Sequence, residues 1–185
     1  MGQLLQEIEL RKSRRALSEQ PVPDDTVRRI MLAATYTASC SNNQPWRFVV
    51  ITEPEELAKA KAALSGGNYW AKMAPLIILV TTKDDLDCQL SDSRNLAQFD
   101  VGMAAENLIL QSVAEGLIAH PIAGYNPELI RKSFEIPAEY ALITLIVVGF
   151  PGDESHLSEK HLAQEHGERS RQHESKVISY NRWFE

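Results

Sequence analysis

The chain has 185 residues, of which 44% are hydrophobic and 24% charged, and its formal net charge is -6. This length predicts a single domain over residues 1–185, and this composition excludes intrinsic disorder. The acidic balance argues against general nucleic-acid binding, which needs a basic face, and no apolar run reaches the roughly 18 residues of a membrane-spanning helix.

The chain begins with two predicted helices, a loop and a strand. Apolar residues at helical spacing indicate an amphipathic helix over residues 1–12. Asp24 can cap the second helix. Residues 35–44 are polar with short side chains, which indicates a loop, and Trp46–Ile51 is β-branched and aromatic, as expected of a strand.

The middle of the chain alternates between helices and apolar runs. Thr52 caps a helix that ends at residues 66–67, which are both glycine. Residues 76–80 form a continuous apolar run, which predicts a strand covered on both faces. Residues 83–95 are polar and carry no clear pattern. Residues 96–117 predict the longest helix, and its apolar middle indicates burial in a core or a subunit interface.

The last third contains one more helix and one more strand. Asn126 can cap a helix that has Pro127 in its first turn. Residues 141–148 form the most apolar predicted strand. Near the C-terminus the apolar residues are Val177, Ile178, Tyr180 and Trp183. They cannot form a core alone, so we expect this tail to dock, for example onto a second subunit. Helices placed between a few strands predict the α+β class.

The sequence lacks the common catalytic motifs: a nucleophile elbow, a P-loop, a dinucleotide-binding GxGxxG and a CxxC pair. His156, His161 and His166 recur in steps of five, so on a helix their imidazoles diverge by roughly 140°. We therefore expect no metal site. Cys40 and Cys88 are far apart in the sequence, and reduced thiols in a cytoplasmic protein are the simplest interpretation. The chemistry must then come from an organic cofactor.

Two basic clusters stand out in this acidic chain, at residues 11–15 and 169–171. Each places a serine between basic residues. Arginine binds phosphate bidentately and a serine hydroxyl adds a donor, so the clusters suggest one small anion rather than a polymer. The alternative is that the first cluster is a solvated helix end that is favoured by the helix dipole.

Seven segments match, in order along the chain, the pattern of one enzyme family. The most specific is Ser-x-x-Asn-x-Gln-Pro-Trp-x-Phe at residues 39–48. The others are the basic-Ser-x-basic motif at 11–15, the start of a long central helix at 100–108, a Pro-Ile-x-Gly loop at 121–124, a strand end at 148–151, and the C-terminal motifs at 169–171 and 181–183. Over nearly its whole length the chain resembles the FMN-dependent nitroreductase family.

This resemblance implies a nitroreductase-like α+β fold, with a central, mostly antiparallel sheet flanked by helices. It also implies an intertwined homodimer with FMN at the subunit interface. The reaction would pass electrons from NAD(P)H through flavin N5 to an electron-poor acceptor, such as a nitroaromatic or a quinone, in ping-pong order. The alternatives are a specialised flavin enzyme of the same fold, such as a dehalogenase or a dehydrogenating oxidase, and a non-catalytic anion-binding module. Neither nucleic acid nor a membrane is expected as a partner.

The resemblance also implies a set of cofactor-binding residues. The two basic clusters would hold the phosphate and ribityl chain, and Arg15 would lie near N1 and O2 of the flavin. Ser39, Asn42 and Gln44 would come from the other subunit, and the loop that starts at Pro121 would pack under the ring. The full set is Arg11, Lys12, Ser13, Arg15, Ser39, Asn42, Gln44, Lys72, Pro121, Ile122, Ala123, Gly124, Arg169 and Arg171.

The sequence departs from the family pattern before the second strand. The family often has an Asn and a Lys three residues apart that both touch the flavin, whereas Asn68 and Lys72 are four apart. At most one keeps that role, and Lys72 is the preferred candidate. His120 stands where relatives vary. It could donate a proton to the acceptor, but a structural histidine bonded to the backbone is the favoured interpretation.

Overall fold

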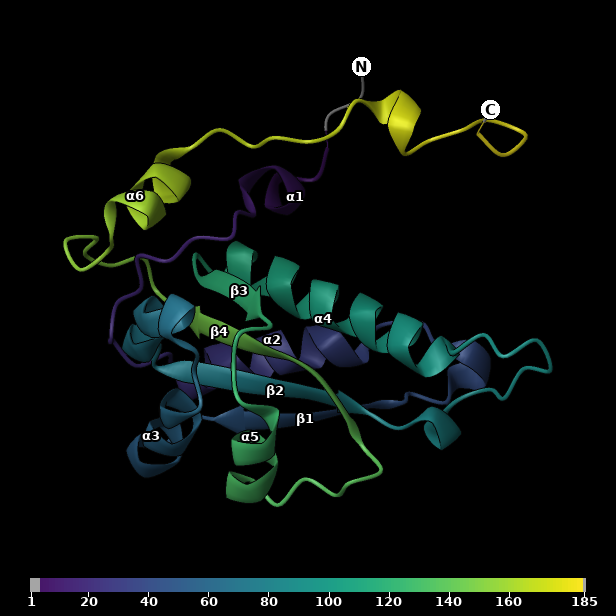
Figure 1. Ribbon diagram of the computed structural model, residues 1–185, viewed down its shortest axis with the longest axis horizontal. Helices are drawn as coiled ribbons and strands as arrows, with labels where there is room; N and C mark the ends of the chain where they lie inside the picture. The colour runs from purple at the N-terminus through teal and green to yellow at the C-terminus, as the bar shows by residue number, and fades with distance from the viewer. Residues whose placement is uncertain (1–3, 185) are drawn as a thin grey trace.

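The sheet has four strands in the order β1-β2-β4-β3, and every neighbouring pair is antiparallel in residues 4–184, the part of the chain that the computed structural model describes (Figure 1). The strands are β1 (Trp46–Ile51), β2 (Leu76–Thr82), β3 (Ile118–Ile122) and β4 (Ala141–Gly149). This arrangement confirms the predicted α+β class with an antiparallel sheet.

Helices cover both faces of this sheet. One face packs against α2 (Asp24–Thr35) and the long α4 (Leu96–Ala114), and the other against α3 (Pro54–Ala62) and α5 (Pro127–Ser133). The molecule therefore has three layers, with the sheet in the middle (Figure 1).

The central strand β2 shows why this layering follows from the sequence. Leu76, Ile78 and Val80 face the α2 and α4 side, whereas Ile77 and Leu79 face the α3 side, and all five are fully buried. Because side chains alternate across a strand, a strand that is apolar at every position must be covered on both faces. The prediction from the continuous apolar run is confirmed.

One strand was missed at a proline, and the end of the longest helix was misplaced near a glycine. Strand β3 was not predicted, because it contains Pro121 and a proline argues against a strand. A sheet tolerates proline in an edge strand, and β3 is the edge strand here. The long helix ends at Ala114, before the predicted residue 117. Gly116 has a positive φ of 76°, and the Leu117 N–H bonds the Ser112 carbonyl at 2.9 Å, so the chain turns there.

Helix starts were predicted to within about two residues. The Asn126 side chain accepts a hydrogen bond from Leu129 N at 3.1 Å, as its capping role requires. Asp24 is instead the first residue of α2, and Pro23 occupies the cap position. Glu53, and not Thr52, occupies the cap position of α3. This helix ends at Ala62, before the predicted glycines, and those glycines begin a 3-10 helix, η2 (Gly66–Met73).

The two terminal segments lie on the same side of the molecule, above α4 in Figure 1. Helix α1 (Gln6–Leu10) and helix α6 (Glu159–His166) lie outside the layers, and the C-terminal segment with η4 (Glu174–Lys176) passes α1 in an extended course (Figure 1). The predicted first helix is thus shorter than residues 1–12, of which 1–3 lie outside the described residues.

The two-sided burial of β2 predicts a large loss of stability when it is truncated. Leu79→Ala should lower the free energy of unfolding by about 2–5 kcal/mol, because it leaves a cavity in a fully buried layer. Val50→Ala in β1 is the control, since Val50 is 38% exposed and should cost less than about 1 kcal/mol. Urea unfolding at one protein concentration measures both variants, and equal losses would contradict this packing.

Candidate functional site

The two basic clusters line one cavity of about 250 Å³. Its cationic wall contains Arg11, Lys12, Arg14, Arg15, Arg169 and Arg171. The residues are more than 150 positions apart in the sequence, yet the Lys12 ammonium donates to the Gly167 carbonyl at 2.9 Å. The expectation that both clusters serve one small anion is compatible with this shared cavity.

A buried carboxylate holds the first cluster in place. The Glu165 side chain, on α6, accepts from Arg14 Nε and from the Arg15 backbone N–H, both at 2.7 Å. Glu165 is only 5% exposed. A buried charge needs a partner of this kind, so Arg14 serves the fold rather than the cavity. The sequence pattern did not single out Glu165, because its pairing spans about 150 residues.

The guanidinium of Arg169 is occupied by backbone carbonyls at the end of α1. Its terminal nitrogens donate to Ile8 O at 3.0 Å and Glu9 O at 2.8 Å, and also to Arg11 O. A cation at the carbonyl end of a helix is stabilising. Arg169 therefore positions α1 and Arg11. Within residues 4–184, the Arg171 guanidinium donates only to its neighbour, the Ser170 carbonyl, at 2.7 Å.

Arg15 is placed differently from the other cations of the cavity. The Arg15 guanidinium lies 5.7 Å from the ring centroid of the buried Trp70. Partial burial lowers the pKa of Arg15. The Arg15 Nε is buried and has no hydrogen-bond partner among the described residues. A buried donor that is left without an acceptor is costly and calls for a ligand.

His120 lies directly beneath this region on β3. Its Nδ1 donates to the Arg14 carbonyl at 2.9 Å, and its ring is 4.7 Å from that of Trp70. Burial lowers the pKa of His120 to about 4, and the nearby Arg15 and Arg11 also lower it. The neutral ring bonded to the backbone agrees with the structural role and not with proton donation.

The loop after β3 rests on Asn68. The Gly124 carbonyl accepts from Ser65 N at 3.0 Å and from Asn68 Nδ2 at 2.8 Å. A Cβ atom on residue 124 would lie 2.5 Å from Ser65 Oγ and 2.7 Å from Asn68 Nδ2, so a larger residue would displace the side chains that hold this loop. Pro121 and Ala123 are exposed at the loop surface, Ile122 is buried in the core, and Lys72 is exposed on η2.

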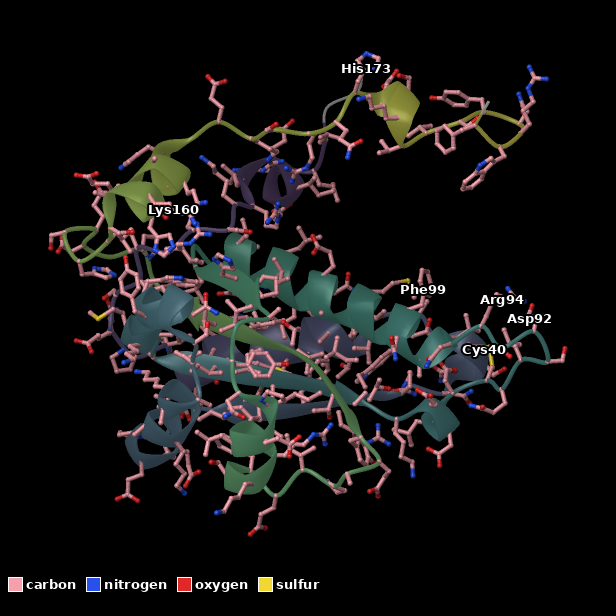
Figure 2. All side chains as sticks on the ribbon, viewed as in Figure 1. Cys40, Asp92, Arg94, Phe99, Lys160 and His173 are labelled. Carbon is pink, nitrogen blue, oxygen red and sulfur yellow. A yellow bond between two sulfur atoms is a disulfide. The ribbon has the colours of Figure 1, made fainter. Side chains whose placement is uncertain are left out.

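The third predicted group lies elsewhere. Ser39, Asn42 and Gln44 belong to the loop around η1 (Cys40–Asn42). Figure 2 shows Cys40 at the opposite end of the molecule from Lys160, which lies on α6 beside the cationic cavity. The structure thus unites the basic clusters and the β3 loop in one region, but it does not bring the 39–44 loop to them within one chain.

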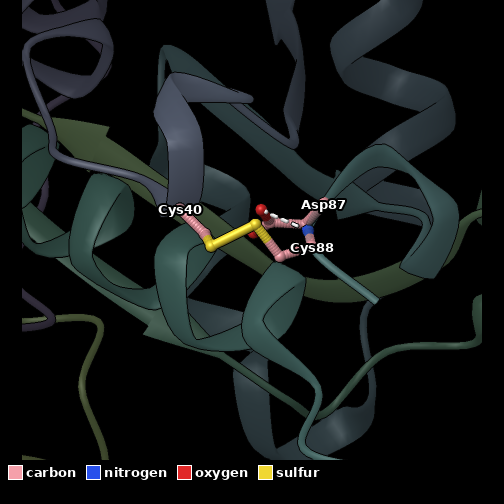
Figure 3. Close-up of side chains that lie close together, drawn as sticks. All are labelled: Cys40, Asp87 and Cys88. Carbon is pink, nitrogen blue, oxygen red and sulfur yellow. Dashed lines mark hydrogen bonds between the residues drawn. A yellow bond between two sulfur atoms is a disulfide. The ribbon is translucent and has the colours of Figure 1, made fainter. Parts of the chain in front are cut away.

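The expectation of two reduced thiols is wrong. Cys40 and Cys88 form a disulfide with a Cα–Cα distance of 6.1 Å (Figure 3). The side-chain ligand atoms of Cys40, Asp87 and Cys88 lie within 4.8 Å of one another, but the two sulfur atoms are bonded to each other and are not thiolates. Nothing in the sequence indicated this pairing, because the cysteines are 48 residues apart and belong to no motif.

The three histidines that were considered as metal ligands do not share a site in the described residues. The His161 ring bonds Tyr69 Oη at 3.1 Å, and His166 Nε2 pairs with Glu154 at 2.9 Å. His156 precedes α6, and its Nε2 is buried without a hydrogen-bond partner among the described residues. Among the described helices, none combines the length and the apolar character that crossing a lipid bilayer requires.

A second, apolar cavity of about 570 Å³ lies between α1, α2 and α4. Leu5, Leu32 and Tyr36 line it and are more than half exposed. The tail is also exposed, with Tyr180 at 78% and Trp183 at 84%. An apolar surface of this kind typically marks an interaction site.

Comparison with known proteins identifies similar chains. The sequence profile of the nitroreductase family matches residues 8–68 and 62–150. The NADH dehydrogenase of Thermus thermophilus is 26% identical over 179 residues, which covers 81% of this chain and 87% of that protein. The 5,6-dimethylbenzimidazole synthase of Rhodospirillum rubrum is 25% identical over 178 residues, or 80% and 82% of the two chains. A crystal structure of an oxidoreductase containing FMN superposes with a TM-score of 0.84 at 26% identity, covering 99% and 94%.

The buried neutral His120 predicts a specific pH dependence of stability. Its pKa is about 4 in the folded chain against 6.5 when exposed, so below pH 6.5 the unfolded chain binds the proton first. Stability should fall as the pH drops from 6.5 to 4, by on the order of 2 kcal/mol at pH 4.5. His120→Gln keeps a donor for the Arg14 carbonyl but does not titrate.

The measurement is the free energy of unfolding at pH 7 and pH 4.5 in both proteins. The carboxylates of the wild type and of His120→Gln lose the same stability on acidification. The wild type should lose more in total, because only its unfolded chain gains a proton on residue 120. The same loss in both proteins would contradict a buried, neutral His120.

Proposed function

Because this chain belongs to the nitroreductase family, we propose that it is an FMN-dependent oxidoreductase that takes electrons from NAD(P)H and passes them to an electron-poor acceptor, such as a nitroaromatic or a quinone. The FMN phosphate would bind in the cationic cavity, and two chains would form a homodimer that completes each site. The FMN in a solved relative supports this cofactor.

The observation that carries the proposal is the meeting of the two basic clusters in one cavity. A chain with a net charge of -6 has concentrated cations from both of its ends at this place. Like charges repel, and a phosphate dianion would offset that repulsion while accepting charge-assisted hydrogen bonds. The buried, unpartnered Arg15 Nε also requires an acceptor. The residues present therefore fit a phosphorylated flavin.

The residues of the cavity divide into direct contacts and supports. Arg11, Ser13 and Arg171 would bind the phosphate. Arg169 acts as a positioning residue, because its guanidinium holds the carbonyls of α1 and of Arg11. Lys12 likewise reaches the Gly167 carbonyl and joins the two clusters. This division explains why six cations can line a site for one anion.

Arg15 would serve the redox part of the cofactor. A bound isoalloxazine ring supplies the two-electron chemistry. The Arg15 backbone N–H donates to Glu165, and the Arg15 guanidinium lies over the Trp70 ring. These two contacts fix the position of the positive charge. There it would stabilise the negative charge that a flavin gains on reduction. Pro121 and Ala123 are exposed, Gly124 is half-buried and Ile122 is buried in the core, so the first three could lie against the ring.

The division of the site residues supports a homodimer. The 39–44 loop lies at the opposite end of the molecule from the cationic cavity (Figure 2), so Ser39, Asn42 and Gln44 could contact the same flavin only from a second copy. The apolar cavity between α2 and α4 offers an interface, and the exposed tail at Val177–Trp183 could dock on the partner.

Loss of one phosphate ligand should weaken FMN binding without a similar effect on riboflavin. Arg171→Ala should cost about 1.5–3 kcal/mol, or roughly ten- to a hundredfold in FMN affinity. Lys59→Ala is the control, because it removes a positive charge on α3, away from the cavity, where Lys59 pairs with Glu56. Fluorescence titration of the apoprotein with both flavins measures the change.

Purified protein should also be yellow and release FMN on denaturation. A colourless protein that fails to take up added FMN would refute the cofactor assignment. An equal loss of FMN and riboflavin affinity in Arg171→Ala would show that the arginine is only structural.

A shared site also predicts complementation between two defective chains. A dimer of Arg171→Ala chains and a dimer of Asn42→Ala chains each carry the same defect in both sites. In a mixed dimer one site carries both defects and the other carries none. A mixed dimer isolated with two affinity tags should therefore recover one tight FMN site, measured by flavin stoichiometry. Recovery of no tight site, or sedimentation of the flavin-bound protein as a monomer, would contradict the shared geometry.

A further inference from the structure

The disulfide joins two segments that secondary structure does not connect. Cys40 opens η1, and Cys88 follows η3 (Asp84–Leu86) in the polar segment 83–95. The Cys88 sulfur is also 3.5 Å from Asn43 Nδ2 and 3.6 Å from Ser41 Oγ. Both cysteines are only half-buried and lie beside exposed residues, so a small thiol can reach the bond.

Two buried carboxyl groups support the two halves of this disulfide. The Asp100 carboxyl accepts the Cys40 N–H at 2.8 Å, and the Asp87 carboxyl accepts the Cys88 N–H at 2.7 Å (Figure 3). Asp87 is 6% and Asp100 is 3% exposed. Burial of the Asp100 carboxyl, together with the nearby Asp87 carboxyl, raises the pKa of Asp100. Two buried carboxyl groups therefore bind the backbone N–H groups of both cysteines.

The loop that follows Cys40 needs such anchors. Ser41, Asn42 and Gln44 have φ values of 50°, 58° and 51°, in the left-handed region that non-glycine residues rarely adopt. Conformations of this kind cost of order 1 kcal/mol or more each and persist only where the surroundings fix them. Within the loop, Gln44 N donates to Ser39 Oγ at 3.0 Å, and Asn43 Nδ2 donates to the Asp87 carboxyl of segment 83–95 at 3.2 Å. Cleavage of the disulfide would remove its covalent connection to segment 83–95.

We propose that Cys40 and Cys88 form a reversible thiol–disulfide site that controls the 39–44 loop and, through it, flavin binding. The inference rests on the proposed function, since it takes the loop to contact FMN. The oxidised form holds Ser41, Asn42 and Gln44 in their left-handed conformation, and the reduced form lets the loop relax. Cellular thiol status would then set how strongly the partner loop holds the cofactor.

The reaction is ordinary thiol–disulfide exchange with a low-molecular-weight thiol. A thiolate attacks one cysteine sulfur, and the Cys40–Cys88 bond breaks as a mixed disulfide forms. The other cysteine leaves as a thiolate and takes up a proton. A second thiol molecule then attacks the mixed disulfide, so two cysteine thiols and one oxidised thiol dimer result. Oxidised glutathione reverses the sequence.

The test compares the oxidised and the dithiothreitol-reduced protein. Thiol titration after denaturation should find no free thiols before reduction and both cysteines free after it. Amide hydrogen exchange should then rise in residues 39–44 and 84–95, and FMN affinity should fall by roughly three- to tenfold, because the binding-competent fraction of the loop falls. The Cys40→Ser/Cys88→Ser double variant should resemble the reduced protein, and dithiothreitol should not change it.

Each result decides the proposal. Two free thiols after treatment with oxidised glutathione would overturn it, as would a disulfide that dithiothreitol cannot reduce in the folded protein. Unchanged exchange and FMN affinity on reduction would show that the bond does not control the loop. If neither form binds FMN, the proposed function fails, whereas the exchange measurement still reports on the thiol site.

Discussion

Glu165 is almost fully buried beside a group of arginines, and its two carboxylate oxygens fix the Arg14 guanidinium and the Arg15 backbone. An isolated carboxylate in such a place would be expensive, and so would several cations crowded together. When the carboxylate and the arginines are paired, their attraction offsets the cost of burying the charges, and the contact holds α6 against residues 11–15. The cavity, the orientation of Arg15 on Trp70 and the support of His120 by the Arg14 carbonyl all depend on this one anchor.

The same region shows how the chain divides its charges. Some cations are satisfied within the fold, as with Arg14 on Glu165 and Arg169 on the carbonyls of α1. Others, Arg11 and Arg171 above all, face the cavity. A basic motif in a sequence does not reveal this division, because it depends on which guanidinium meets a carboxylate or a carbonyl that comes from a distant part of the chain. Composition indicated the two basic clusters, and the structure shows which of their cations are paired within the fold.

Much of the fold could be predicted from local patterns. The apolar runs of β2 and β4 and the Asn126 cap are local signals, and they are confirmed. Strand β3 could not be predicted, since it contains a proline, which argues against a strand in a local sequence pattern. The Cys40–Cys88 bond and the Glu165 anchor could not be predicted either, because each joins residues that are far apart in the sequence. Local spacing carries no information on such pairs.

The placement of the anchor at both ends of the chain has a consequence for biosynthesis. Residues 11–15 leave the ribosome about 150 residues before Glu165 and Arg169, so the first cluster must wait without its counter-charge while the sheet is made. Because contacts of such long sequence separation close late, the cavity forms after the sheet and its helices have packed. A nascent chain that stops short of residue 165 could therefore hold a complete sheet and still have no anion site.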